Sequence, residues 1–303
     1  MATLGWIGLG NMGGRMTGHL VRAGHTVLGY DLNPAATAAA QAEGVTIVDS
    51  IAAALDGADA LFTSLPKGQH VRSVYEGADG VWAHAATSTL LIDCSTIDVE
   101  TSRYLHEQSE VSGHHFVDAP VSGGISGAAD GTLAFMLGGD SADTARAAEY
   151  IEPMSGSTIV AGGPTMGIAA KIVNNMMLLI DVLANSEGSQ LAEELGLDPK
   201  VFWQIASASS GRSWAQQTWY PVPGVIPTSA ADHNFDATFT ADLANKDIGL
   251  ALEAGRQTGV HLPAATLAAD QLQQLIDEGL GGKDCTLVAK YATPDGTLRG
   301  WQP

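Results

Sequence analysis

The sequence has little cysteine and little positive charge. Only Cys94 and Cys285 occur, too few and too far apart for a disulfide scaffold or a cysteine metal cluster. The 9 histidines show no ligand spacing such as H-E-x-x-H, so we expect no metal site. Lys and Arg number 14 against 33 Asp and Glu, a formal charge of -19, which repels nucleic-acid phosphate. We therefore expect no nucleic-acid partner, and an acidic substrate would need local hydrogen-bond donors.

Long uninterrupted apolar runs are also missing. The longest apolar stretch, residues 168–184, contains Lys171, Asn174, Asn175 and Asp181, which argues against a lipid-spanning helix. The N-terminus shows no basic segment, cleavage site or transit pattern before the first apolar run. We expect a soluble, cytoplasmic chain without a membrane partner.

The 303 residues predict two domains, at about 100 to 200 residues per domain. Residues 1–163 alternate short β-rich runs with helical stretches, which is typical of repeated βα units and a largely parallel, Rossmann-type sheet. The strands expected are 3–9, 26–30, 60–65, 90–93, 115–118, 133–137 and 158–160.

Residues 164–303 contain no further strand pattern. A helical run from about 167 to 195 ends at Gly196, and about 40 Å of helix is long enough to join two domains. The remainder, including a helix over 238–255, predicts an all-α domain.

A glycine-rich turn follows the first predicted strand. Gly8-Leu9-Gly10-Asn11-Met12-Gly13 matches G-x-G-x-x-G and opens a helix, as a dinucleotide-binding loop requires. The glycines allow a tight turn, close approach of a pyrophosphate and helix–strand packing.

The second strand leads to Asp31, whose carboxylate can accept hydrogen bonds from a ribose diol. Its charge would repel a 2′-phosphate, and Leu32-Asn33-Pro34 supplies no arginine to neutralise one. The sequence predicts NAD over NADP, although Asp31 could instead cap the next helix.

Three later strands end in loops that should all meet at one edge of the sheet. They are Leu65-Pro66, the loop with Thr96, and Ser122-Gly123-Gly124. The last offers a hydroxyl and successive N–H groups, a nest suited to a carboxylate, but it could also be a plain glycine turn.

Gly167, Lys171 and Asn175 are spaced four residues apart and share one face of the long predicted helix. Apolar neighbours of Lys171 should lower its pKa toward an acid/base range; the alternative is a lysine whose head reaches water. Taken alone, Lys246-Asp247 could be an ordinary charge pair in water, and Arg212 an ordinary surface charge.

Together these motifs resemble the β-hydroxyacid dehydrogenase family over nearly the whole chain, and within it the 3-hydroxyisobutyrate branch. The residues that carry the resemblance are the glycine loop through Met16, residues 118–124, Gly167 with Lys171 and Asn175, Lys246-Asp247, residues 210–214 and residues 221–225.

The resemblance implies that Lys171 is the catalytic acid/base, with Ser122, Gly123, Gly124 and Asn175 at the substrate. It places Leu65, Pro66, Thr96 and Lys246 at the cofactor. The implied reaction is NAD-dependent oxidation of (S)-3-hydroxyisobutyrate to methylmalonate semialdehyde, a step of valine degradation, by a homodimer or homotetramer.

Other activities remain open. Tartronate semialdehyde reductases and succinic semialdehyde reductases share the glycine loop, Lys171 and Asn175. Two activities are disfavoured. Asn174 stands where 6-phosphogluconate dehydrogenases carry histidine, which argues against phosphosugar decarboxylation. Imine reductases usually lack a lysine at the position of Lys171, so its presence argues against them. A non-catalytic nucleotide-binding scaffold would not need a desolvated lysine.

Overall fold

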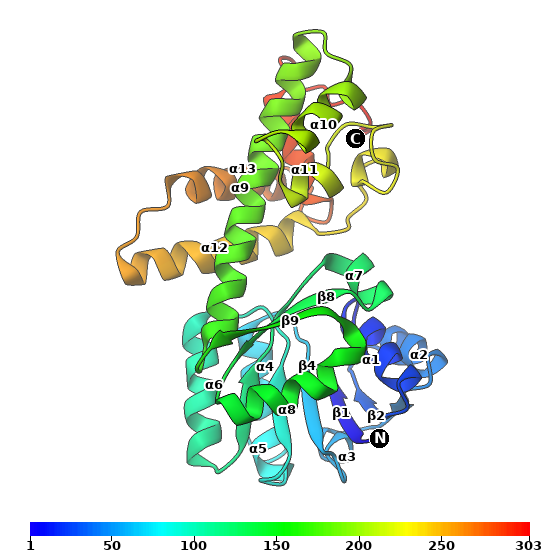
Figure 1. Ribbon diagram of the computed structural model, residues 1–303, viewed down its shortest axis with the longest axis vertical. Coiled ribbons are helices and arrows are strands. Elements are labelled where there is room, and N and C mark those ends of the chain that lie inside the picture. The colour runs from blue at the N-terminus through cyan, green and yellow to red at the C-terminus, as the bar shows by residue number, and fades with distance from the viewer. The chain divides into compact units, whose positions relative to one another are not determined.

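The computed structural model describes residues 1–303. The chain forms two compact units, Met1–Lys171 and Ile172–Pro303, whose elements are drawn in Figure 1. The boundary falls inside one long helix, α9 (Met166–Glu194).

The first unit is built on a nine-stranded sheet with the order β3-β2-β1-β4-β5-β6-β8-β7, and β9 pairs with β8. β1 to β6 are parallel, whereas β8 runs antiparallel to β6 and β7. Strand order reverses between β1 and β4, the place where such sheets bind ligands. The strands are β1 (Thr3–Ile7), β2 (Thr26–Tyr30), β3 (Thr46–Ile47), β4 (Ala60–Thr63), β5 (Leu90–Asp93), β6 (His115–Asp118), β7 (Val121–Ser122), β8 (Leu133–Gly138) and β9 (Ser155–Gly162).

Helices flank this sheet and cover its apolar strands (Figure 1). Short polar side chains set several helix starts; for example, Asn33 accepts the Ala35 N–H at 3.0 Å and Asp98 accepts the Thr101 N–H at 2.7 Å. The helices are α1 (Gly13–Arg22), α2 (Pro34–Ala42), α3 (Ile51–Ala54), α4 (Gly68–Tyr75), α5 (Val81–His84), α6 (Val99–Val111), α7 (Gly124–Asp130), α8 (Ser141–Ile151) and the 3-10 turn η1 (Glu152–Met154).

The second unit is helical. Its core gathers apolar residues from α9, α12, α13 and the C-terminal 3-10 segment, including Leu179, Ile248, Leu272 and Leu287. α12 and α13 lie side by side (Figure 1), and Gly259 in the left-handed region ends α12. The remaining elements are α10 (Pro199–Ala208), α11 (Trp214–Thr218), η2 (Ala230–His233), α12 (Ala241–Thr258), α13 (Pro263–Asp277) and η3 (Cys285–Ala292).

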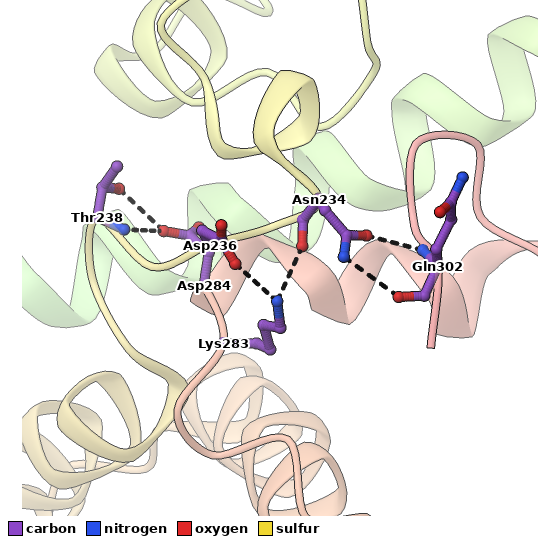
Figure 2. A network of polar contacts seen from close by, with 6 residues as sticks. All are labelled: Asn234, Asp236, Thr238, Lys283, Asp284 and Gln302. Carbon is purple, nitrogen blue, oxygen red and sulfur yellow. Dashed lines mark hydrogen bonds and ion pairs between the residues drawn. The ribbon is translucent and has the colours of Figure 1, made fainter.

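A polar network fixes the loop before α12 (Figure 2). The buried Asp284 carboxylate accepts from Thr238 N (2.8 Å), Thr238 Oγ1 (2.9 Å) and Phe239 N (3.1 Å). Asn234 exchanges two hydrogen bonds with the backbone of Gln302, and Lys283 bonds to Asp236 at 2.7 Å. The C-terminal segment therefore holds the loop that leads into α12.

α9 is long and apolar enough to cross a membrane by length and composition alone. Core helices of soluble proteins pass the same test, and 44% of its most apolar window is buried here. Its apolar stretch also carries Lys171, Asn175 and Asp181, side chains that are costly in lipid. We interpret α9 as a core helix.

The predicted fold class is confirmed: an α/β Rossmann-type unit, a long helix at 166–194 and a helical C-terminal part. Two strands were not predicted, β3 and β7. Ser122, expected in a loop, is the last residue of β7, where it pairs with Ala134 of β8. The helix expected over 238–255 begins only at Ala241 and continues to Thr258.

Candidate active site

The glycine loop joins β1 to α1, and each glycine meets a different constraint. Gly8 has φ +96°, and a Cβ there would lie 2.3 Å from Ser64 O. A Cβ at Gly13 would lie 2.0 Å from Gly8 O, whereas one at Gly10 would meet nothing within 4 Å. The buried Trp6 indole donates to Gly8 O at 2.9 Å. The loop is thus tightly packed at Gly8 and Gly13, while the space beside Gly10 is free. This arrangement fits a pyrophosphate bound at the N-terminus of α1.

Asp31 follows β2 and contacts this loop directly. Its Oδ2 accepts from Leu9 N at 2.6 Å, and its Oδ1 accepts from Asn33 N at 2.7 Å. Asn33, not Asp31, caps α2. The carboxylate is therefore oriented beside the glycine loop, and each oxygen retains a lone pair for a ribose hydroxyl.

The loops after β4 and β5 are joined through Ser95. Leu65 N donates to Ser95 Oγ at 2.8 Å, and Ser95 Oγ donates to Asp93 Oδ1 at 2.6 Å. Thr63 Oγ1 also donates to Asp93 Oδ1 at 2.6 Å. Burial raises the pKa of Asp93 to about 6, opposed by the hydrogen bonds from Ser95 and Thr63. This buried acid supports the loops that carry Leu65, Pro66 and Thr96.

Ser122, Gly123 and Gly124 lie where β7 meets α7. Gly123 has φ +131° and Gly124 has φ +67°, backbone conformations that side-chain-bearing residues rarely adopt. All three residues are partly exposed. Because the first N–H groups of a helix have no partner within it, this turn can offer several donors to a carboxylate.

On α9, Lys171 and Asn175 lie one turn apart and are both buried, with exposed fractions of 7% and 3%. Lys171 is not a surface lysine with its head in bulk water. Asn175 Nδ2 donates to Asp247 Oδ2 of α12 at 2.6 Å, and Lys246 Nζ lies 2.8 Å from Asp247 Oδ1. The helical unit therefore brings Asn175, Lys246 and Asp247 together.

Lys246 and Asp247 are not a solvated charge pair, because their side chains are only 21% and 6% exposed. Arg212, in contrast, is exposed. No group of three or more His, Cys, Asp or Glu side chains is arranged to hold a metal ion.

Sequence reasoning missed one contact that supports these groups and one aromatic row in the helical unit. Asp247 was paired with Lys246 in sequence, but its bond to Asn175 spans 72 residues and has no local signal. An aromatic row was also missed: Trp214 contacts Trp219 with ring centroids 5.0 Å apart, and Trp219 stacks on Phe239 at 6.1 Å. In the sequence, only Trp214, at the end of the 210–214 stretch, pointed toward it.

Two family models together match nearly the whole chain. Residues 3–163 match the NAD binding domain of 6-phosphogluconate dehydrogenase. Residues 165–292 match the NAD-binding domain of NADP-dependent 3-hydroxyisobutyrate dehydrogenase.

Curated relatives agree with these models. A probable 3-hydroxyisobutyrate dehydrogenase of Mycobacterium tuberculosis is 44% identical over 89% of this chain and 91% of its own length. An NAD-dependent L-serine dehydrogenase of Pseudomonas aeruginosa is 36% identical over 97% of this chain and 99% of its own. The mouse mitochondrial 3-hydroxyisobutyrate dehydrogenase is 36% identical, covering 95% and 86%.

A solved structure of the Mycobacterium tuberculosis 3-hydroxyisobutyrate dehydrogenase with L-serine superposes with a TM-score of 0.88, 42% identity and coverage of 96% of this chain and 99% of that one. The chain therefore belongs to the 3-hydroxyisobutyrate dehydrogenase family of the β-hydroxyacid dehydrogenases, as an NAD(P)-binding oxidoreductase with a Rossmann domain.

Proposed function

We propose that this enzyme oxidises (S)-3-hydroxyisobutyrate to methylmalonate semialdehyde with Lys171 as the general base, and as the general acid in reverse. The observation that carries the proposal is the burial of Lys171 one helical turn from Asn175. Burial takes water away from an amine and so favours its neutral form, which can accept the proton of a substrate hydroxyl. Asn175, oriented by Asp247, is suited to bind that hydroxyl.

The substrate carboxylate is assigned to Ser122, Gly123 and Gly124. A chain with formal charge -19 repels an anion at long range, so binding depends on short-range donors. The Ser122 hydroxyl and the N–H groups at the start of α7 are such donors. No arginine is needed in this arrangement.

The cofactor is assigned to the glycine loop, residues 8–13, with Asp31, Leu65, Pro66, Thr96 and Lys246. When bound, the nicotinamide supplies the hydride acceptor for this oxidation. Gly10 leaves room for the pyrophosphate, and the oriented Asp31 carboxylate suits a ribose diol. The negative charge of Asp31 disfavours a 2′-phosphate, so we propose NAD rather than NADP. A higher kcat/KM with NADP would contradict this preference.

L-serine is the second candidate substrate. A serine dehydrogenase is 36% identical over 97% of the chain, and the Mycobacterium structure was solved with L-serine. Both compounds place a primary hydroxyl on the carbon next to the α-carbon of a carboxylate, so the same donors and base can serve either.

Steady-state kinetics on 3-hydroxyisobutyrate, L-serine, 3-hydroxypropionate, glycerate and 4-hydroxybutyrate, each with NAD and NADP, tests the assignment. We expect the highest kcat/KM with (S)-3-hydroxyisobutyrate and NAD. A higher value with L-serine would make the enzyme a serine dehydrogenase. Strong preference for glycerate or 4-hydroxybutyrate would indicate a tartronate or succinic semialdehyde reductase instead.

We also propose a role in valine degradation, a cytoplasmic location and a homodimeric or homotetrameric assembly. Exposed apolar side chains on α9 and α10, such as Val173, Met177 and Ile205, support self-association, because surfaces of this kind commonly mark interfaces. Light scattering in solution should give at least twice the chain mass of 31.2 kDa. A monomer would contradict the assembly while leaving the reaction untouched.

A further inference from the structure

Asp118, the last residue of β6, holds the beginning of α9. Its Oδ2 accepts from Ile168 N at 2.7 Å, and its Oδ1 accepts from Thr165 N at 3.1 Å. α9 begins at Met166, so the N–H of Ile168 belongs to the first turn, where helix donors lack partners within the helix. A buried carboxylate 50 residues earlier in the chain therefore takes the place of a local capping side chain.

The first turn of α9 has no room to move against this carboxylate. A Cβ on Gly167 would lie 2.3 Å from Met136 O and 2.6 Å from Asp118 O, and a Cβ on Gly138 would lie 2.5 Å from Gly167 N. Thr165, just before the helix, has φ +70°. A β-branched residue rarely adopts a left-handed backbone conformation. Such a conformation persists only where the surrounding contacts hold it in place.

His106 provides a further hydrogen bond to the Asp118 carboxylate. It lies on α6, and its Nε2 donates to Asp118 Oδ1 at 2.7 Å. Its ring packs edge-on against Phe116, with centroids 4.7 Å apart and planes at 83°. The histidine and carboxylate side chains are 10% and 4% exposed. The carboxylate is thus held by hydrogen bonds from α6 and from the start of α9.

We propose that Asp118, oriented by His106, is a positioning residue that sets the place of Lys171. This inference rests on the proposed role of Lys171 in proton transfer. Ile168 and Lys171 are three residues apart on one rigid helix, a rise of about 4.5 Å, so a shift at the first turn is carried to the amine. A displacement of about 1 Å can lower turnover by about 100-fold.

The test is Asp118→Asn in the full-length enzyme. The amide has the same shape but turns a donor toward at least one N–H group. We expect kcat to fall about tenfold or more, with the KM for NAD within about twofold of wild type, because a buried N–H group loses its acceptor and the change acts on α9 rather than on the glycine loop. A general loss of folding would change both parameters.

A matched control is Asp143→Asn. Asp143 of α8 also bonds to a histidine, His115, at 3.0 Å, in the same domain but away from α9. The Asp143→Asn variant should leave kcat unchanged. If Asp143→Asn lowers kcat as much as Asp118→Asn does, the effect is general and the inference is wrong.

A double-mutant comparison separates this inference from the proposed function. In a Lys171→Ala background, Asp118→Asn should lower the remaining kcat by less than about twofold, since coupled residues are not additive. The full single-mutant effect in that background would refute positioning through Lys171. Near-normal turnover of Lys171→Ala alone would instead refute the proposed function, and wild-type kcat in Asp118→Asn would refute only the positioning role.

Should Asp118→Asn fail to fold, the histidine provides the same test. His106→Phe removes the donor but keeps an aromatic ring, whereas His106→Gln keeps an N–H donor. We expect the Phe variant to lower kcat several-fold with NAD KM unchanged, and the Gln variant to recover most of that loss. Equal kcat in both variants would contradict the proposal.

Discussion

Asn175 on α9 is bonded to Asp247 on α12, with Nδ2 and Oδ2 2.6 Å apart. Asp247 also pairs with Lys246, so one buried carboxylate orients a proposed substrate ligand and a proposed cofactor ligand. The helical unit thereby brings Asn175 to the adjacent pair Lys246-Asp247, whose aspartate follows 72 residues later in the sequence.

Replacing Asp247 by Ala should lower kcat/KM for the hydroxy acid about tenfold or more, because it leaves the Asn175 amide and the Lys246 ammonium without their shared acceptor. Steady-state kinetics measures this effect. Asp270→Ala, at an exposed position of α13, serves as the control and should be neutral. Equal activity of the two variants would show that the contact has no role in the reaction.

Stability should depend on pH through Asp93. Burial raises its pKa from 3.8 to about 6, so the folded chain keeps a proton that the unfolded chain releases near pH 4. Its stabilising contribution is therefore fully present below about pH 4 and is lost as pH rises through about 6. The free energy of unfolding of wild type relative to Asp93→Asn should fall by about 2 to 3 kcal/mol between pH 4 and pH 7.

Urea unfolding of both proteins across this range measures that difference, with Asp79→Asn, an exposed position, as the baseline. A difference that stays constant from pH 4 to pH 7 would mean that Asp93 does not titrate as burial implies.

Two aspartates in the network of Figure 2 should differ sharply in their effect on folding. Asp284 is buried and accepts from Thr238, Phe239 and Thr286, so Asp284→Ala should cost about 3 kcal/mol or more of unfolding free energy. Asp236 makes an ion pair while its side chain is 77% exposed, and Asp236→Ala should cost less than about 1 kcal/mol. Similar unfolding midpoints for the two variants would contradict the assigned roles.

Two glycines of α9 provide another matched pair. Gly167→Ala would place a methyl group 2.3 Å from Met136 O, so we expect a loss of about 2 kcal/mol or more in stability, together with reduced kcat. A Cβ at Gly188 meets nothing within 4 Å, and Gly188→Ala should be neutral or stabilising by up to about 1 kcal/mol. Thermal unfolding compares the two, and a stable, fully active Gly167→Ala would contradict close packing there.

Local patterns predicted much of the fold. The glycine loop, the alternation of strands and helices, and the long helix to within a residue of each end followed from periodicity and terminators such as Gly196. β3 was missed because it has only two residues, and β7 because its pairing with β8 defines it. The start of α12 was placed too early, since the N–H groups of Thr238 and Phe239 bond to Asp284, about 45 residues later.

In the candidate site, too, local relationships could be predicted from the sequence and long-range contacts could not. Lys171 and Asn175 share a helix face, so their spacing alone relates them. Asp118, His106 and Asp247 act through contacts between separate elements, and no local spacing reports such contacts. Sequence patterns therefore indicated the groups proposed for the chemistry, while the structure was needed to find the residues that orient them.

Lys171 is proposed to transfer the substrate proton, and the decisive measurement is the kcat of Lys171→Ala with (S)-3-hydroxyisobutyrate and NAD. We expect a loss of about 100-fold or more, with NAD affinity within about threefold of wild type and full activity in the exposed control Lys200→Ala. Turnover of Lys171→Ala near the wild-type value would show that Lys171 does not transfer the proton.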